Sequence, residues 1–543
     1  MFTKDDCVKD VQEKVIDNDK ELVKEKKLVN NNDKVLDKEI EVEDNRKDNI
    51  EGNEASSEEY KVGTCYQKIA GSDSKENSCN HKKSFVKKYK EILIRKEIIY
   101  LVLPIMVEQC FTILLGVINT MMSGHIGKSA VAAIGTVDSV NNMFISFFAA
   151  LSVGATVVVA QQIGQKKIED ANETVKQALF ASLAVSITLS VILWILRVHL
   201  IETCFSEATD LVKQNAKIYL EFTLISYPFI AIEQISNGIL RGSGDTRTPM
   251  TITIRMNIVN LILGYILIFG INLTSMGIPI HTLSFGIEGT ALAIAIARVY
   301  GAILVLRVLL KGQKIVQLKN IFSFRMNHNI QGKIFSIGIP AGVESLLFNG
   351  GKFIIQIFVV AMGTNAISAN TIGFSCANIM NVIGNSIALG ATTIVGQYVG
   401  RRDIKGAKNN LKYMTAFATG LMMTFGLIFI PILPHIVALY TNDQDVIRIA
   451  TTLLVVNSFA MFAWPSSFVL SAGLKGAGDT RYTMITALIG MWLFRIVVGY
   501  LLGVTLHIGV LGVWLGMYSD WVVRGAMYIR RLHGSKWMKH AIT

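Results

Sequence analysis

From Glu97 to its C-terminus the chain is a succession of apolar stretches of about twenty or more residues, separated by short polar connections. A helix of that length crosses the hydrocarbon core of a bilayer, about 30 Å thick, and satisfies its own backbone hydrogen bonds. We count twelve stretches, the first at about 98–123 and the last at about 509–530. The sequence therefore predicts an all-α membrane protein with twelve transmembrane helices.

The distribution of Lys and Arg predicts how the chain is oriented. Basic residues such as Lys87, Lys88 and Arg95 precede the first stretch, and others follow every even-numbered stretch. Cytoplasmic loops carry this excess. We therefore expect a multi-pass protein of the cell (plasma or inner) membrane with both termini cytoplasmic. The formal net charge of +12 then reflects topology rather than binding to nucleic acid.

Residues 1–90 have a different composition, rich in Lys, Glu, Asp, Asn and Ser and poor in aromatic residues. Such a segment buries too little apolar surface to fold stably. We expect a disordered polar cytoplasmic extension over 1–90, with a short amphipathic helix within 8–45 as the alternative. No apolar core follows the N-terminus, so no cleavable signal peptide is expected.

The apolar region repeats itself. An offset of 236 residues, shortened by two for the last pair, aligns Pro104 with Pro340, Glu108 with Glu344, GATVVVAQQIG (154–164) with GATTIVGQYVG (390–400), and RGSGDTR (241–247) with KGAGDTR (475–481). Six helices per half is an even number, so both halves enter the membrane in the same orientation. The sequence therefore predicts two six-helix lobes, 91–320 and 321–543, related by a pseudo-two-fold axis along the membrane normal, with a cleft between them.

Ionisable side chains at membrane depth are costly, so they usually face a cavity or a partner. Glu108 and Glu344, each four residues after a proline, are candidates for binding substrate or ion; the alternative is that they brace the starts of their helices. Lys352 lies about 12 Å beyond Glu344 on the same helical face, so we expect it at mid-membrane facing the cleft. Its alternative is a buried ion pair or a side chain that snorkels to the membrane surface. Asp138 is a further candidate, unless it lies near the outer interface.

Buried amides extend this polar lining. The candidates for substrate or ion binding are Asn119, Asn142, Asn349, Asn370 and Asn378, with hydrogen bonding between helices as the alternative. No HExxH motif, paired aspartates or Ser with a nearby His stands among the apolar stretches. We therefore expect that the protein is not an enzyme and that it has no catalytic residue, no metal site and no cofactor.

The paired motifs have structural interpretations. In the two (R/K)G(S/A)GDTR segments the glycines permit a tight turn, and Asp245 or Asp479 can cap the next helix. A phosphate-binding loop is the alternative, but the Walker pattern is missing. Gln161 and Gln397 end the two GAT blocks, where helix packing accounts for the small residues around them. We interpret Arg495 as a structural strut.

Four blocks, LPIMVEQ (103–109), IPAGVESLLF (339–348), ATTIVGQYVG (391–400) and LRGSGDTRTPM (240–250), resemble the recurrent blocks of the multidrug and toxic compound extrusion family. The resemblance runs from Pro104 to the last helix. It implies a V-shaped bundle of two lobes that exports drugs or other organic compounds in exchange for H⁺ or Na⁺. Many bacterial members carry an acidic residue where this chain has Asn119, which cannot titrate, so that coupling mechanism is not expected here.

We therefore predict a secondary active antiporter that works by alternating access in the lipid bilayer, as a monomer, on a small-molecule organic substrate. H⁺ or Na⁺ is the coupling ion. Acidic side chains favour cationic substrates, but Lys352 opposes this, so the charge of the substrate stays open. The alternative function is a flippase for lipid-linked oligosaccharide or a related amphipathic substrate, which would line its cleft with several Arg residues.

Overall fold

The computed structural model describes residues 96–540, except 117, 120, 123–124, 205–208, 271–284, 313 and 320–324. The chain divides into two units, Met1–Tyr89 and Lys90–Thr543, and only the second contains described residues. The predicted polar extension lies outside them, and so does the predicted border between the lobes near residue 320. Both remain predictions.

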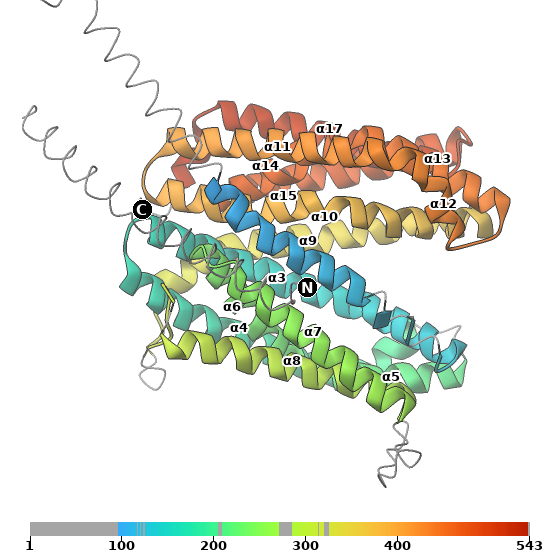
Figure 1. Ribbon diagram of the computed structural model, residues 1–543, viewed down its shortest axis with the longest axis horizontal. Coiled ribbons are helices and arrows are strands. Elements are labelled where there is room, and N and C mark those ends of the chain that lie inside the picture. The colour runs from blue at the N-terminus through green and yellow to red at the C-terminus, as the bar shows by residue number, and fades with distance from the viewer. Residues whose placement is uncertain are drawn as a thin grey trace, which may run out of the picture. The chain divides into compact units, whose positions relative to one another are not determined.

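Every regular element among the described residues is a helix (Figure 1). The first half contains the helix Lys96–Gly116, α3 (Lys128–Gly164), α4 (Ile168–Cys204), α5 (Asp210–Ile225), α6 (Tyr227–Gly242), α7 (Arg247–Phe269) and α8 (Gly286–Lys311). The second half contains α9 (His328–Val360), α10 (Thr364–Gly400), α11 (Ile404–Phe429), η2 (Ile430–Ile432), α12 (Leu433–Ala438), α13 (Gln444–Ala460), α14 (Trp464–Gly476), α15 (Thr480–Leu488), η3 (Ile489–Ile496), α16 (Val497–Tyr500), η4 (Leu501–Thr505), α17 (Val510–His533) and η5 (Lys536–His540).

Nine of the described helices are long and apolar enough to cross a membrane, and the bent pair α13–α14 makes a tenth span. Two predicted segments fall outside that count. One is split into α5 and α6, which have 16 residues each, and the other is α17, which carries buried Asp520 and Arg524. With these two, the structure contains the twelve predicted segments in the predicted order.

Two segments that we expected to be single helices, 215–240 and 447–472, are broken. The first is interrupted at Ser226, between α5 and α6, and the second bends by 56° between α13 and α14. A proline, Pro228 or Pro465, lies in the first turn of the helix after each break. Proline has no backbone N–H to donate, so it starts a helix well but does not continue one. Both halves therefore have a proline just after the break in the fourth predicted segment.

The first helix of each half packs at its start into the opposite half. Ile334 and Ile337, at the start of α9, belong to the core of the first half, whereas Ile98 and Val102 belong to the core of the second. At Gly154 of α3, an added Cβ would lie against the carbonyl oxygen of Ile334. In Figure 1, α3 and α9 accordingly run between a bundle that contains α4 to α8 and a bundle that contains α10 to α17.

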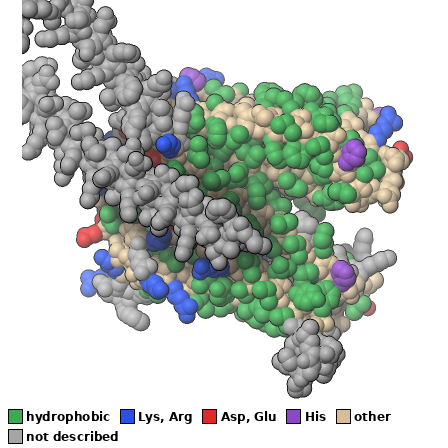
Figure 2. Space-filling view, viewed as in Figure 1, with side chains coloured by type: hydrophobic (Ala, Val, Ile, Leu, Met, Phe, Trp, Pro, Cys, Tyr) green, Lys and Arg blue, Asp and Glu red, His purple; other side chains and the backbone are tan. Residues whose placement is uncertain are grey.

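The halves meet most closely where α3 ends at Gly164 and α10 ends at Gly400. A Cβ at Gly164 would overlap the carbonyl oxygen of Gln397, and one at Gly400 would overlap that of Gln161. We call this end of the bundle the closed end. At the opposite end the surface is hollowed between the bundle that carries α12 and α13 and the bundle that carries α5 (Figure 2). The unit is therefore sealed at one end and open at the other.

Candidate functional site

Three of the polar cavities in this helical unit lie between its membrane-spanning helices. The N-half cavity, about 510 Å³, is lined by residues that include Glu108, Asn119, Asp138, Asn142, Glu233 and Arg298. The C-half cavity, about 430 Å³, is lined by residues that include Lys352, Asn378, Asn381, Trp464, Arg495 and Trp521. The central cavity, about 440 Å³, is lined by both halves, through residues such as Gln109, Ser146, Ala149, Glu344, Ser345 and Lys475.

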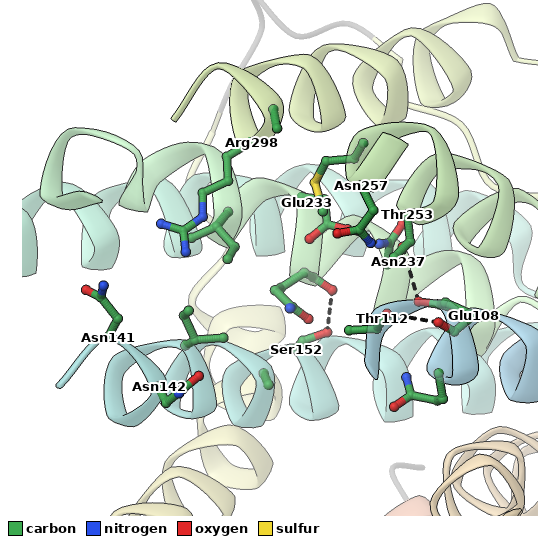
Figure 3. Close-up of a pocket in the computed structure, with 18 of the residues that line it drawn as sticks. Glu108, Thr112, Asn141, Asn142, Ser152, Glu233, Asn237, Thr253, Asn257 and Arg298 are labelled. Atoms are coloured by element: carbon green, nitrogen blue, oxygen red, sulfur yellow. Dashed lines mark hydrogen bonds between the residues drawn. The ribbon is translucent and has the colours of Figure 1, made fainter. Parts of the chain in front are cut away.

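Toward the closed end, the N-half cavity ends at an ion pair between Glu108 and Arg241 of α6. Glu108 is only 3% exposed, and Thr253 of α7 donates a hydrogen bond to the same carboxylate oxygen at 3.2 Å (Figure 3). The other carboxylate oxygen is buried without a partner. Glu108 therefore connects the first helix of this half to its fourth and fifth predicted segments.

The middle of the N-half cavity holds a second carboxylate, Glu233, on α6. The amide of Asn237, one turn further along, donates to Glu233 Oε1 at 2.5 Å. Figure 3 shows Glu233, Asn237 and Asn257 directed into the same space. Within the described part of the chain, Glu233 has no cation within ion-pair distance. A carboxylate and two amides at membrane depth form an oxygen-rich site that suits a proton or a small hard cation.

Toward the open end lies the third carboxylate, Asp138. Tyr219 donates a hydrogen bond to Asp138 Oδ1 at 3.0 Å, and Asn141 donates to it at 3.3 Å. Tyr227 in turn donates to Asn141 at 2.8 Å. Arg298 of α8 reaches across the cavity and donates to the hydroxyl of Ser226 at 2.7 Å, at the break between α5 and α6.

The second half repeats the first ion pair. Lys475 Nζ lies 2.8 Å from Glu344 Oε1, and these residues correspond by the repeat to Arg241 and Glu108. Glu344 lines the central cavity rather than the C-half cavity. The first basic residue of each (R/K)G(S/A)GDTR motif therefore pairs with the glutamate of the first helix in its own half.

The aspartate of each motif also has an equivalent role. Lys314 Nζ, just after α8, lies 2.8 Å from Asp245 Oδ2, and Arg531 Nε, in the last turn of α17, lies 2.7 Å from Asp479 Oδ2. Each motif therefore also contacts the end of the sixth helix of its half or the residues just after it. The Asp245 carboxylate accepts a hydrogen bond from the backbone N–H of Thr248 at 3.0 Å, as expected of a cap. Asp479 occupies the N-cap position of α15 but makes no side-chain capping hydrogen bond there.

Three cations surround one aromatic ring at the C-half cavity. Lys352, Arg495 and Arg524 lie 5.1, 5.6 and 5.5 Å from the ring centroid of Phe348. Arg524 also pairs with Asp520, with 2.6 Å between Nε and Oδ1. The C-half cavity is therefore basic, whereas three carboxylates line the N-half cavity.

The eight predicted site residues divide among these places. Glu108, Asn119 and Asn142 line the N-half cavity, Lys352 and Asn378 line the C-half cavity, and Glu344 lines the central cavity. Asn370 is buried, accepts a hydrogen bond from Trp514 at 2.9 Å and donates one to Gln356 at 3.3 Å. Asn349 lies on α9 and is not among the residues that line the three cavities.

Several polar residues at these sites escaped the sequence analysis. Glu233, Asn237 and Arg298 line the N-half cavity, Arg524 lines the central cavity, and Asp520 pairs with Arg524. The rule that selected Glu108 also applies to them, because each charged member interrupts an apolar stretch. Arg495, interpreted as a strut, lines the C-half cavity. The packing role assigned to Gln161 and Gln397 was incomplete, since each donates a hydrogen bond to the opposite half, to Gly476 and Gly242, at 3.0 Å.

Comparison with known proteins places these features in context. A family model described as MatE matches residues 104–266 and 340–501, one match in each half. The chain is 26% identical over 438 residues to the "Uncharacterized transporter YisQ" of Bacillus subtilis, covering 80% of this chain and 93% of the relative. It is 25% identical over 460 residues to the "Probable multidrug resistance protein NorM" of Thermotoga maritima, covering 85% of this chain and 97% of the relative.

Solved structures share the fold. "Crystal structure of MATE in the straight conformation" superposes with a TM-score of 0.73 at 20% identity, covering 81% of this chain and 96% of the other. "Outward-facing conformation of a multidrug resistance MATE family transporter of the MOP superfamily" gives 0.72 at 20% identity, covering 81% and 97%. The two-lobe arrangement of helices predicted from the repeat is therefore confirmed.

Proposed function

Because the chain belongs to the MatE family, the multidrug and toxic compound extrusion family of transporters rather than of enzymes, we propose that it is a secondary active antiporter. It exports small organic compounds from the cytoplasm in exchange for H⁺ or Na⁺ by alternating access. The relatives named as probable multidrug resistance proteins support this proposal. The closed end, next to which the basic loops lie, is the cytoplasmic end, so this conformation opens outward.

The observation that carries the proposal is the set of three carboxylates in the N-half cavity. Glu108 is paired with Arg241, and Asp138 is hydrogen-bonded by Tyr219 and Asn141, whereas Glu233 is contacted by the amide of Asn237. We assign binding of the coupling ion to Glu233, because it is the carboxylate of the three without a cation or a phenol at hydrogen-bond distance among the described residues.

Alternating access requires the ion to bind the two conformations with different affinity. Glu233 and Asn237 lie on α6, which ends at Gly242, and Gly242 accepts the hydrogen bond from Gln397 that helps to seal the closed end. An ion bound at Glu233 therefore acts on the helix that participates in the seal. This physical connection supports coupling between the N-half cavity and the opening of the cytoplasmic end.

The test is efflux of a fluorescent organic compound from proteoliposomes, with proton and sodium gradients imposed separately. Gradient-driven efflux by the wild type that is lost in Glu233→Gln, and retained in Glu288→Gln at the exposed start of α8, is the expected result and identifies the ion. Efflux that is independent of both gradients, or equal in the two variants, contradicts the proposal.

The flippase alternative rests on a different observation, the basic residues of the C-half cavity, because basic side chains bind phosphate groups. The sequence shows too few arginines for a flippase, but the structure brings Arg495 and Arg524 together on the ring of Phe348. Transfer of a fluorescent lipid-linked oligosaccharide between leaflets of the same proteoliposomes, in the absence of efflux of soluble compounds, would favour this function.

A further inference from the structure

Two cations at the C-half cavity lack an anionic partner among the residues that the structure describes. Lys352 forms no ion pair within 4.0 Å, and Arg495 contacts the ring of Phe348 but makes no hydrogen bond or ion pair. Arg495 is only 4% exposed, and its Nε atom is buried without a partner. The one nearby carboxylate, Asp520, is engaged by Arg524 through Nε at 2.6 Å and Nη2 at 2.9 Å.

Of these two charges, Arg495 is buried at membrane depth, whereas Lys352 is exposed to the space of the cavity. A charged side chain within the membrane costs several kcal/mol unless it is paired or hydrated, and contact with the face of one aromatic ring compensates only on the order of 1 kcal/mol per cation. Phe348 is shared by Lys352, Arg495 and Arg524. The cluster is therefore electrostatically incomplete, and an anion would complete it.

The backbone holds this cluster in an unusual way. Arg495 lies in the π-helical segment η3. The π-helix is rare in proteins, and where it occurs it is often at a functional site. Gly490, at the start of the same segment, has no Cβ, and a Cβ there would overlap Asp520 Oδ1 and press on the side chain of Arg524. The local helix distortion and the glycine thus allow η3 and α17 to bring two arginines and one aspartate together.

The remaining walls are amide and aromatic. Asn378, Asn381 and Asn457 line the cavity, and the Oδ1 atom of Asn381 is buried without a partner. The rings of Trp464 and Phe468 are stacked at 4.4 Å between centroids. The indole N–H of Trp521 is buried and unpaired, so it is a further donor.

The size of the cavity limits its occupant. A volume of about 430 Å³ fits one drug-sized molecule and leaves no room for the two acyl chains of a phospholipid. Flat aromatic walls favour an aromatic ring, whereas a lipid-linked sugar would use hydroxyl-rich contacts. The cavity is therefore matched to a compact compound that combines a ring with a negative charge.

We propose that the C-half cavity binds a small aromatic organic anion, with its carboxylate, sulfonate or phosphate group on Lys352 and Arg495 and its ring against Trp464 and Phe468. The two cavities then bind ligands of opposite charge. The carboxylates of the N-half cavity bind the coupling cation, and the cations of the C-half cavity bind an organic anion. This assignment rests on the proposed export function only in taking the bound anion to be the exported compound.

Binding to the purified full-length protein tests the site directly. Isothermal titration calorimetry uses naphthalene-2-sulfonate as the probe, its neutral isostere naphthalene-2-sulfonamide, and phosphatidylglycerol as a competitor. Loss of one charge-assisted contact weakens binding about tenfold. We expect the sulfonate to bind at least tenfold more tightly than the sulfonamide, Lys352→Gln to weaken it about tenfold, and Lys352→Arg to restore it.

The matched control is Arg530→Gln, which removes a positive charge from the exposed end of α17 and should leave binding of the sulfonate unchanged. A thermal melt of each variant verifies that it is folded. Equal binding of sulfonate and sulfonamide, or equal binding by wild type and a folded Lys352→Gln, overturns the proposal. The proposal is also overturned if phosphatidylglycerol displaces the sulfonate at a concentration below that of the sulfonate itself, because the site would then belong to a lipid headgroup.

Efflux measurements separate this proposal from the function on which it rests. Sulfonate binding without any gradient-driven efflux leaves the anion site in place and overturns the antiporter. Gradient-driven efflux of an organic cation without sulfonate binding supports the antiporter and overturns the anion site.

Discussion

The side-chain amide of Gln161 donates a hydrogen bond to the carbonyl oxygen of Gly476, 315 positions later in the chain, at 3.0 Å. The repeat supplies the second copy of this contact, from Gln397 to Gly242, also at 3.0 Å. Both bonds join one half to the other beside Gly164 and Gly400, where the helices are in backbone contact. The pair is therefore a symmetric latch that any opening of the closed end must break.

Removing this latch should favour the conformation that opens at the closed end. Two neutral hydrogen bonds contribute on the order of 2 kcal/mol together, which is roughly a thirtyfold change in an equilibrium constant. We expect the double variant Gln161→Ala, Gln397→Ala to label faster at Leu389→Cys, a residue of the central cavity, with an impermeant maleimide added from the cytoplasmic side. The background replaces the six native cysteines with serine.

The matched control for the latch is Gln162→Ala. Gln162 neighbours Gln161 but accepts its hydrogen bond from Thr174 of the same half, at 2.8 Å. Its labelling rate should equal that of the background protein, and an equal rate in the latch variant as well would show that the latch does not hold the closed end.

The ion pair between Glu344 and Lys475 should stabilise the second half. Breaking a largely buried pair costs on the order of 3 kcal/mol, because the remaining charge is left without compensation. We expect Glu344→Gln and Lys475→Gln each to lower the thermal unfolding midpoint in detergent, and the double variant to lose less than the sum of the two. Additive losses would show that the two side chains do not interact, and Glu288→Gln, exposed at the start of α8, should leave the midpoint unchanged.

The Asp245–Lys314 contact predicts a dependence of stability on pH. Burial raises the pKa of Asp245, but hydrogen bonds from Lys314 and Thr248 outweigh it, so its pKa lies below the ordinary value of 3.8. A carboxylate whose pKa is lowered on folding contributes stability above its unfolded pKa, and this is lost as the pH falls through the folded pKa. Asp245→Asn should therefore unfold at a lower temperature than wild type at pH 7. The difference between the two unfolding midpoints should shrink below about pH 4.

That difference should be measured by a fluorescence melt in detergent between pH 7 and pH 3.5. Asp445→Asn, at an exposed position in the first turn of α13, removes a carboxylate without such a partner and should show a much smaller difference at every pH. A difference between Asp245→Asn and wild type that grows as the pH falls would contradict the assignment.

Two glycines of the second half should respond in opposite directions to alanine. At Gly400 a Cβ would overlap the carbonyl oxygen of Gln161, whereas at Gly420 of α11 a Cβ meets nothing within 4 Å. Alanine favours a helix over glycine by about 1 kcal/mol. We expect Gly420→Ala to raise the unfolding midpoint slightly and Gly400→Ala to lower it, and a rise in both variants would show that the contact at Gly400 relaxes freely.

The sequence by itself determined the membrane helices, their order and the two lobes. Long apolar stretches have one solution in a bilayer, a helix that satisfies its own backbone, and the aligned pairs such as Glu108 and Glu344 reveal the duplication directly. The same rule of costly buried charge selected Lys352, which lines the C-half cavity and not the central cavity between the halves where we expected it, and its binding role stays a prediction. It also applied to Glu233 and Arg298, although neither was selected.

Only the tertiary structure decided which charged side chains are paired with an opposite charge and which line a cavity without one. Glu344 pairs with Lys475 in a distant segment. Asn370 is hydrogen-bonded to Trp514 and Gln356. Lys352 and Arg495, by contrast, both contact one aromatic ring beside a cavity. Spacing along one helix defines a face but not the helix opposite it. The partner of a buried charge depends on how helices from distant segments cross, and that arrangement is a property of the packed bundle.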